Sequence, residues 1–134
     1  IFGGVVVENP IAAIVPTLLA FLINLIREIV KDLEDVEGDS KAGVITFPIR
    51  FGFKNSRLLI VILTILLILF TFFPFITNLY RIEFFILVMV VVNPILVYCL
   101  KLLFENKSDK NLKKVSNLLK LDMIIGLIAI YLGV

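Results

Sequence analysis

Residues 58–75 read LLIVILTILLILFTFFPF, an apolar run without a single charged side chain. Three further apolar runs lie at about residues 10–30, 82–103 and 115–134. A helix of roughly 20 apolar residues crosses the hydrocarbon core of a bilayer. Lipid offers no hydrogen bonds to the backbone, and none of the runs alternates as a barrel strand would, so we expect four transmembrane helices. The predicted fold is an all-α membrane protein with one transmembrane helical domain over residues 1–134.

The composition excludes several kinds of chemistry. Of the 134 residues, 60% are hydrophobic and 18% are charged, and the mean hydropathy is +1.11. Soluble domains are usually only about 45–50% apolar. Histidine is absent and Cys99 is the single cysteine, which excludes a Ser-His-Asp triad, a histidine zinc site and an internal disulfide within this chain. A net charge of +2 without a long basic run argues against a nucleic-acid partner.

The chain starts with an apolar stretch, Ile1–Val7, which has neither the basic start nor the cleavage site of a signal peptide. We interpret this stretch as the end of an earlier membrane helix. The chain is therefore expected to be part of a larger protein. Its expected partners are the remaining N-terminal helices of that protein and the surrounding membrane lipids.

Basic residues are distributed unevenly among the connections between the apolar runs. Six lie around the first connection, six around the third, and only Arg81 around the second. Helices with short connections alternate sides, and Lys and Arg accumulate in cytoplasmic loops. We therefore predict a multi-pass protein of the cell membrane, with cytoplasmic loops at about residues 31–57 and 104–114.

A few residues inside the runs are not apolar or not helix-forming. Pro16 and Pro94 predict kinks, and helix–helix hydrogen bonds account for Asn24 and Asn93. Asp122 is costly in a bilayer, so it either faces the bundle or lies close to the cytoplasmic end of its span. Its neighbouring lysines favour the interfacial position over a role in a pocket.

The most informative segment is residues 27–39, REIVKDLEDVEGD, where six of the eleven acidic residues fall between Glu28 and Asp39. Asp32, Asp35 and Asp39 have the spacing i, i+3, i+7, and Glu28 lies four residues before Asp32. At about 100° per residue, these four carboxylates share one helical face within an arc of roughly 60°. Such a row of like charges opposes helix formation unless something positive lies against it.

Carboxylate oxygens suit hard divalent cations, and Mg²⁺ takes one or two carboxylates together with phosphate oxygens and water. The row therefore suggests a Mg²⁺-bridged phosphate or diphosphate at the membrane boundary. The remaining phosphate charge would be met by nearby basic side chains: Arg27, Lys31, Lys41 and Arg50. The alternative is a solvated helix end at which Arg27, Lys31 and Lys41 simply balance the acids.

Residues 27–48, REIVKDLEDVEGDSKAGVITFP, resemble the second aspartate-rich motif of the UbiA superfamily of intramembrane prenyltransferases. One departure is Phe47, where the superfamily more often has Leu. The stretch Phe2-Gly3-Gly4 also fits the end of the helix that precedes this motif. The match consists of Asp32-x-x-Asp35-x-x-x-Asp39, Lys41-Ala42-Gly43 and Thr46-x-Pro48.

The resemblance implies a nine-helix bundle, of which this chain would contain the last four helices and a trace of the fifth. The first acidic motif of the superfamily, N-D-x-x-D-x-x-x-D, is absent here, so the fragment alone is expected to be inactive. In the implied mechanism, Mg²⁺ lies between the two motifs and binds the diphosphate of a prenyl donor. The motif is most similar to that of enzymes which transfer a geranylgeranyl group from its diphosphate to geranylgeranylglyceryl phosphate, a lipid-phosphate acceptor, in archaeal ether-lipid synthesis.

The resemblance also assigns roles to individual residues, in an active site that faces the cytoplasm. Asp32, Asp35 and Asp39 are the implied metal ligands, and Asp35 and Asp39 are the implied catalytic residues. The implied substrate-binding residues are Arg27, Glu28, Lys31, Lys41 and Arg50.

Two alternatives remain open. Superfamily members with an aromatic acceptor, of the homogentisate, 4-hydroxybenzoate or naphthoate type, share a similar E-G-D motif. A non-enzymatic transporter or channel segment could instead use the carboxylate row to coordinate a translocated cation. That function predicts acids or amides near the middle of several facing helices.

Overall fold

The computed structural model describes residues 10–133, with side chains from residue 13 onward. The stretches Ile1–Val7 and Phe2-Gly3-Gly4, which we interpreted as the end of a preceding helix, lie outside the described residues. Within the described part, every regular element is helical, which confirms the predicted all-α fold. The elements are α2 (Pro10–Glu34), α3 (Val36–Lys41), α4 (Phe47–Thr71), α5 (Phe73–Ile76), α6 (Ile82–Leu87), the π-helical segment η1 (Val88–Val92), α7 (Asn93–Glu105) and α8 (Asp109–Gly133).

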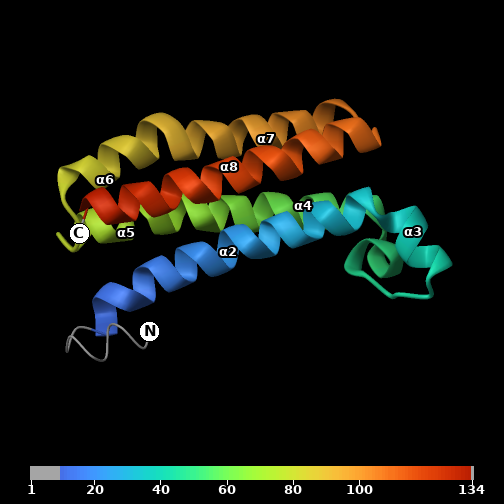
Figure 1. The fold of residues 1–134 in the computed structure, drawn as a ribbon, viewed down its shortest axis with the longest axis horizontal. Helices are drawn as coiled ribbons and strands as arrows, with labels where there is room; N and C mark the ends of the chain where they lie inside the picture. Colours follow the sequence, from blue (N-terminus) through green and yellow to red (C-terminus); the bar gives the residue numbers. More distant parts are fainter. Residues whose placement is uncertain (1–9, 134) are drawn as a thin grey trace.

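Four helical stretches are long and apolar enough to cross a membrane. They are Ala13–Glu34, Phe47–Ile76, Ile82–Glu105 and Asp109–Gly133. The helices lie side by side as a bundle, in which α2 packs against α4 and α8, and α8 packs against α6, η1 and α7 (Figure 1). The α2–α4 and α7–α8 connections both lie at the end of the bundle where α3 is found, and α5 and α6 lie at the opposite end (Figure 1).

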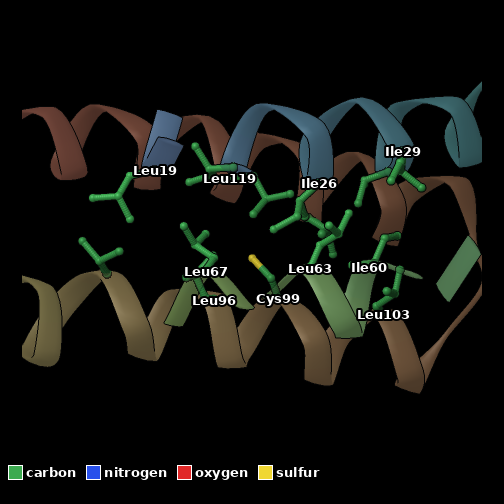
Figure 2. Packing of buried hydrophobic residues seen from close by; sticks show 14 of the residues in the cluster. Leu19, Ile26, Ile29, Ile60, Leu63, Leu67, Leu96, Cys99, Leu103 and Leu119 are labelled. Atoms are coloured by element: carbon green, nitrogen blue, oxygen red, sulfur yellow. The ribbon is translucent and has the colours of Figure 1, made fainter. Parts of the chain in front are cut away.

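The core runs along the bundle axis and is built from one apolar stripe on each long helix. On α4 the buried residues Ile60, Leu63 and Leu67 have the spacing i, i+3, i+7, which places them on one face. They pack with residues such as Ile26 of α2 and Leu96 of α7 (Figure 2). Large apolar side chains also cover the opposite faces, as expected for helices that contact lipid or further helices: Leu58, Ile62, Ile65 and Leu69 of α4 are all exposed.

The two polar residues inside the spans differ in their surroundings. Asn93 is buried, and its Nδ2 donates to Thr71 Oγ1 of α4 at 3.4 Å, which confirms the predicted helix–helix hydrogen bond. Asn24 is exposed on α2, so it makes no such bond within the described bundle. Pro94 lies in the first turn of α7, directly after the π-helical segment η1. A proline there lacks the N–H that a regular helix would use, which fits the change in helix type.

Candidate active site at the acidic end of the bundle

The acidic segment forms the end of α2 and all of α3. The helix is interrupted at Asp35, which has φ −96° and ψ 9°. Hydrogen bonds still cross the interruption, because Asp35 N–H donates to Lys31 C=O and Asp39 N–H donates to Asp35 C=O, each at 2.9 Å. The segment is therefore a bent helix, and the acidic row continues across the bend.

A glycine turn follows α3 and leads the chain back into the bundle. Gly43 has φ +71°, a left-handed conformation that glycine adopts without steric cost. Its N–H donates to Ser40 C=O at 3.2 Å, and Val44 N–H donates to Asp39 C=O at 2.9 Å. These two bonds form a Schellman cap. The Lys-Ala-Gly sequence after the last acid of the row is thus the stop signal of α3.

The first turn of α4 is also bent away from the rest of its helix. Thr46 precedes α4 in an extended conformation and Pro48 lies in its first turn, where the missing N–H costs nothing. Gly52 has φ +83° and ψ 168°, so residues 47–51 form a short separate turn before the long helix begins. Arg50 lies on this turn, with its guanidinium 5.4 Å from the centre of the Phe51 ring.

The carboxylates of the row influence one another but do not form a closed metal site. Asp32 is half-buried, and the carboxylates of Asp39, Glu28 and Asp35 all act on its charge. No group of three His, Cys, Asp or Glu side chains among the described residues could hold a metal ion. A separation of seven residues corresponds to a rise of about 10 Å along a helix, so the row is too long for all its members to bind one ion. The set of three ligands therefore stays a prediction.

The basic residues predicted to meet phosphate have different surroundings. Arg27 Nη1 lies 3.0 Å from Glu28 Oε1, and Lys41 Nζ lies 2.6 Å from Glu37 Oε1. Lys41 and Glu37 are largely exposed, and exposed pairs of this kind contribute only about 0.3–0.5 kcal/mol. Lys31 is exposed and makes no ion pair within the described part of the chain. The pairing of Arg27 and Lys41 is what a solvated helix end would show, so that interpretation explains part of the segment.

Arg27 has one feature that the sequence did not reveal. Only 21% of its side chain is exposed, and its Nε is buried without an acceptor among the described residues. Buried donors are nearly always paired, so an unpaired guanidinium N–H beside a carboxylate row is a free donor for an anion.

The prediction that Asp122 occupies the interface is wrong. Asp122 is fully buried in α8, and neither carboxylate oxygen has a hydrogen-bond partner within the described residues. It borders a cavity of about 100 Å³ between the helices, which is otherwise lined almost entirely by apolar groups such as Leu19, Leu67 and Val88. The helical period explains the error. Asp122 shares the buried stripe of α8 with Val115 and Leu119, whereas Lys120 lies on the exposed side.

Comparison with known proteins agrees with the motif and the fold. Residues 1–124 match the UbiA prenyltransferase family. A protein of Methanosphaera stadtmanae named digeranylgeranylglyceryl phosphate synthase is 32% identical over 133 residues, which are 99% of this chain and 48% of that protein. A protein of the same name from Methanocaldococcus jannaschii is 36% identical over 137 residues, covering 99% of this chain and 46% of that protein. The chain thus spans about half the length of the curated relatives it matches.

A solved structure described as digeranylgeranylglyceryl phosphate synthase in membranes has the same arrangement of helices. It superposes with a TM-score of 0.78 at 36% sequence identity, over 88% of this chain and 43% of that chain. The match of sequence over almost the whole chain and the match of fold lead to one conclusion. The chain belongs to the UbiA prenyltransferase family.

Proposed function

We propose that this chain forms one half of the catalytic site of a prenyltransferase. The proposed reaction transfers a geranylgeranyl group from its diphosphate to geranylgeranylglyceryl phosphate in archaeal ether-lipid synthesis. The substrates are supported by the name of the relatives, digeranylgeranylglyceryl phosphate synthase. The half-site is supported by their length, which is about twice that of this chain. The other half of the site is proposed to come from N-terminal helices of the same protein.

The observation that carries the proposal is the carboxylate row Glu28, Asp32, Asp35 and Asp39, together with the unpaired Nε of Arg27 at the same helix end. The carboxylates repel one another, so the row gains stability when a cation lies against it. A buried N–H without an acceptor gains stability when an anion lies against it. A metal diphosphate supplies both charges in one ligand.

Any two carboxylates of the row would supply the number of oxygen ligands that Mg²⁺ usually takes from a protein. Because Mg²⁺ needs one or two carboxylates when phosphate oxygens and water complete its shell, Asp35 with either Asp32 or Asp39 is a sufficient contribution from this chain. Bound Mg²⁺ would neutralise the charge of the departing diphosphate. We assign metal binding to Asp32, Asp35 and Asp39, and catalytic importance to Asp35 and Asp39.

The remaining polar residues bind and orient the substrates in this proposal. Arg27 donates from Nε to a phosphate oxygen, with Glu28 holding its guanidinium through their 3.0 Å ion pair. Lys31 and Arg50 are exposed and make no ion pair with a described carboxylate, so their charges are available to phosphate. Lys41 is available as well, because its exposed pair with Glu37 is weak.

The apolar bundle next to this end keeps the prenyl chain and the reacting carbon away from water. The acidic row lies at the same end of the bundle as both basic connections (Figure 1). Since basic connections are retained in the cytoplasm, we propose that the active site faces the cytoplasm.

The experiment that tests this function uses the purified full-length protein, in which this chain is joined to its N-terminal helices, with geranylgeranyl diphosphate and Mg²⁺. We expect diphosphate release coupled to prenylation of geranylgeranylglyceryl phosphate, and no release after chelation of Mg²⁺. Prenylation of homogentisate, 4-hydroxybenzoate or a naphthoate in its place would reassign the acceptor. Cation flux in proteoliposomes without prenyl transfer would contradict the enzymatic proposal altogether.

A further inference from the structure

A second group of cations lies at the same end of the bundle, on elements other than those of the acidic row. Arg57 of α4 has its guanidinium 4.3 Å from the centre of the Phe104 ring at the end of α7 and 5.9 Å from the Phe53 ring. Lys107, in the α7–α8 connection, has its Nζ 5.0 Å from the centre of the same Phe53 ring. We call Phe53, Arg57, Phe104 and Lys107 the aromatic–basic cluster.

The positive charges of this cluster have no counter-ion among the described residues. Three ion pairs are found in the described residues, and neither Arg57 nor Lys107 takes part in any of them. Arg57 also donates no hydrogen bond to a described protein group. A guanidinium that stacks on a ring uses its flat face and leaves the N–H groups at its edge free. The ring contacts therefore hold the cation in place without satisfying its donors.

Apolar surface adjoins the cluster on both helices that carry it. Phe104 is itself 56% exposed, and Val97, seven residues earlier on the same face of α7, is equally exposed. On α4, the exposed side chains Leu58, Ile62 and Ile65 form one stripe that begins at the residue after Arg57, about 100° around the helix from it. A ligand that fits this surface has an anionic head next to Arg57 and Lys107 and an apolar tail along the helices.

We propose that the aromatic–basic cluster binds the phosphate headgroup of an anionic membrane phospholipid, which serves as a bound structural lipid and not as a substrate. Charge complementarity is the basis of this choice, because basic pockets between membrane helices bind anionic headgroups and guanidinium groups pair with phosphate through two parallel hydrogen bonds. The apolar stripes on α4 and α7 supply the contact for the lipid chains. The inference does not depend on the proposed enzymatic function.

The test measures binding of phosphatidylglycerol and phosphatidylcholine to the purified protein by native mass spectrometry over a range of lipid concentrations. We expect wild-type protein to bind phosphatidylglycerol at least about 10-fold more tightly than phosphatidylcholine, a difference of about 1.4 kcal/mol. Arg57→Gln removes the charge and should abolish this preference. Phe104→Leu removes the supporting ring but keeps the charge, and should weaken the preference.

The matched control is Lys113→Gln, which removes one positive charge from an exposed position near the start of α8 that makes no ring contact. It should retain the preference within about 2-fold. Equal losses in Arg57→Gln and Lys113→Gln would mean that only the overall charge matters, and would overturn the site.

Circular dichroism of each variant identifies a loss of fold. If Arg57→Gln is misfolded, Arg57→Lys takes its place, and unchanged lipid preference in that variant and in Phe104→Leu overturns the site as well.

A competition experiment distinguishes a structural phospholipid from the proposed acceptor substrate as the ligand of the cluster. Geranylgeranylglyceryl phosphate is added to protein that already carries phosphatidylglycerol. We expect the phosphatidylglycerol to remain bound, because its site is not the acceptor site. Stoichiometric displacement would show that the cluster binds the acceptor, and would overturn the assignment to a structural lipid.

Discussion

The backbone N–H of Val44 donates to the carbonyl of Asp39 at 2.9 Å, across Gly43 with its φ of +71°. This hydrogen bond ties the last carboxylate of the acidic row to the segment that returns to α4. The position of the Asp39 backbone therefore depends on Gly43, a residue that has no side chain.

Replacing Gly43 should damage the site without removing any functional group. Gly43→Ala forces a Cβ into the left-handed region, which costs roughly 1–2 kcal/mol, although no neighbouring atom lies within 4 Å of the added Cβ. We expect a loss of that size in the free energy of unfolding in mixed micelles, and reduced prenyl transfer. Gly38→Ala is the control, because Gly38 lies inside α3 with open space around it and helical backbone angles. That variant should be neutral or more stable by up to about 1 kcal/mol.

Asp122 is expected to reduce the stability of the bundle. Its carboxyl group is fully buried without a partner in the described chain and borders a largely apolar cavity. Asp122→Leu removes the unpaired polar group and adds apolar volume beside that cavity, so we expect a gain of about 1–3 kcal/mol in the free energy of unfolding. Asp122→Asn keeps a buried polar group of the same shape and should gain much less. A clear loss of stability in Asp122→Leu would reveal a favourable interaction of this carboxyl group.

The contact between α8 and α6 leaves no room for a side chain at Gly133. A Cβ there would overlap Phe84 Cβ, whereas a Cβ at Gly126 would meet nothing within 4 Å. Gly133→Ala should therefore lower the free energy of unfolding by about 1–3 kcal/mol, as overpacking does. Gly126→Ala should leave it unchanged or raise it. Equal effects in the two variants would mean that helix propensity, and not the close approach to Phe84, determines the outcome.

Much of the fold follows from the sequence because lipid imposes a simple rule. A run such as residues 58–75 has one stable solution in a bilayer, a helix, and the helical period identifies its buried face. The sequence did not reveal where the helices bend. Asp35 interrupts a periodic pattern without any proline or glycine, and only Gly43 and Gly52 signal the turns around it.

The candidate site was predictable in composition but not in geometry. Spacing placed Glu28, Asp32, Asp35 and Asp39 on one face, and their mutual repulsion agrees with that. Spacing says nothing about which cations are already paired, so the unpaired Nε of Arg27 and the pair between Lys41 and Glu37 are evident only from the three-dimensional structure. For Asp122, the charge of the neighbouring lysines indicates the interface, whereas the helical period indicates the buried position that the residue occupies.

The measurement that tests the central claim most directly compares Asp39→Asn with Glu37→Gln in Mg²⁺-dependent prenyl transfer. Both changes remove one negative charge from α3, but Glu37 pairs with Lys41 outside the row, whereas Asp39 belongs to the row and acts on the charge of Asp32. We predict that Asp39→Asn lowers transfer by at least about 100-fold, the loss typical of a group that binds the catalytic metal or fixes its ligands. Glu37→Gln should stay within about 3-fold of wild type. Near-normal transfer by Asp39→Asn, or equal losses in the two variants, would contradict a metal-diphosphate site on the acidic row.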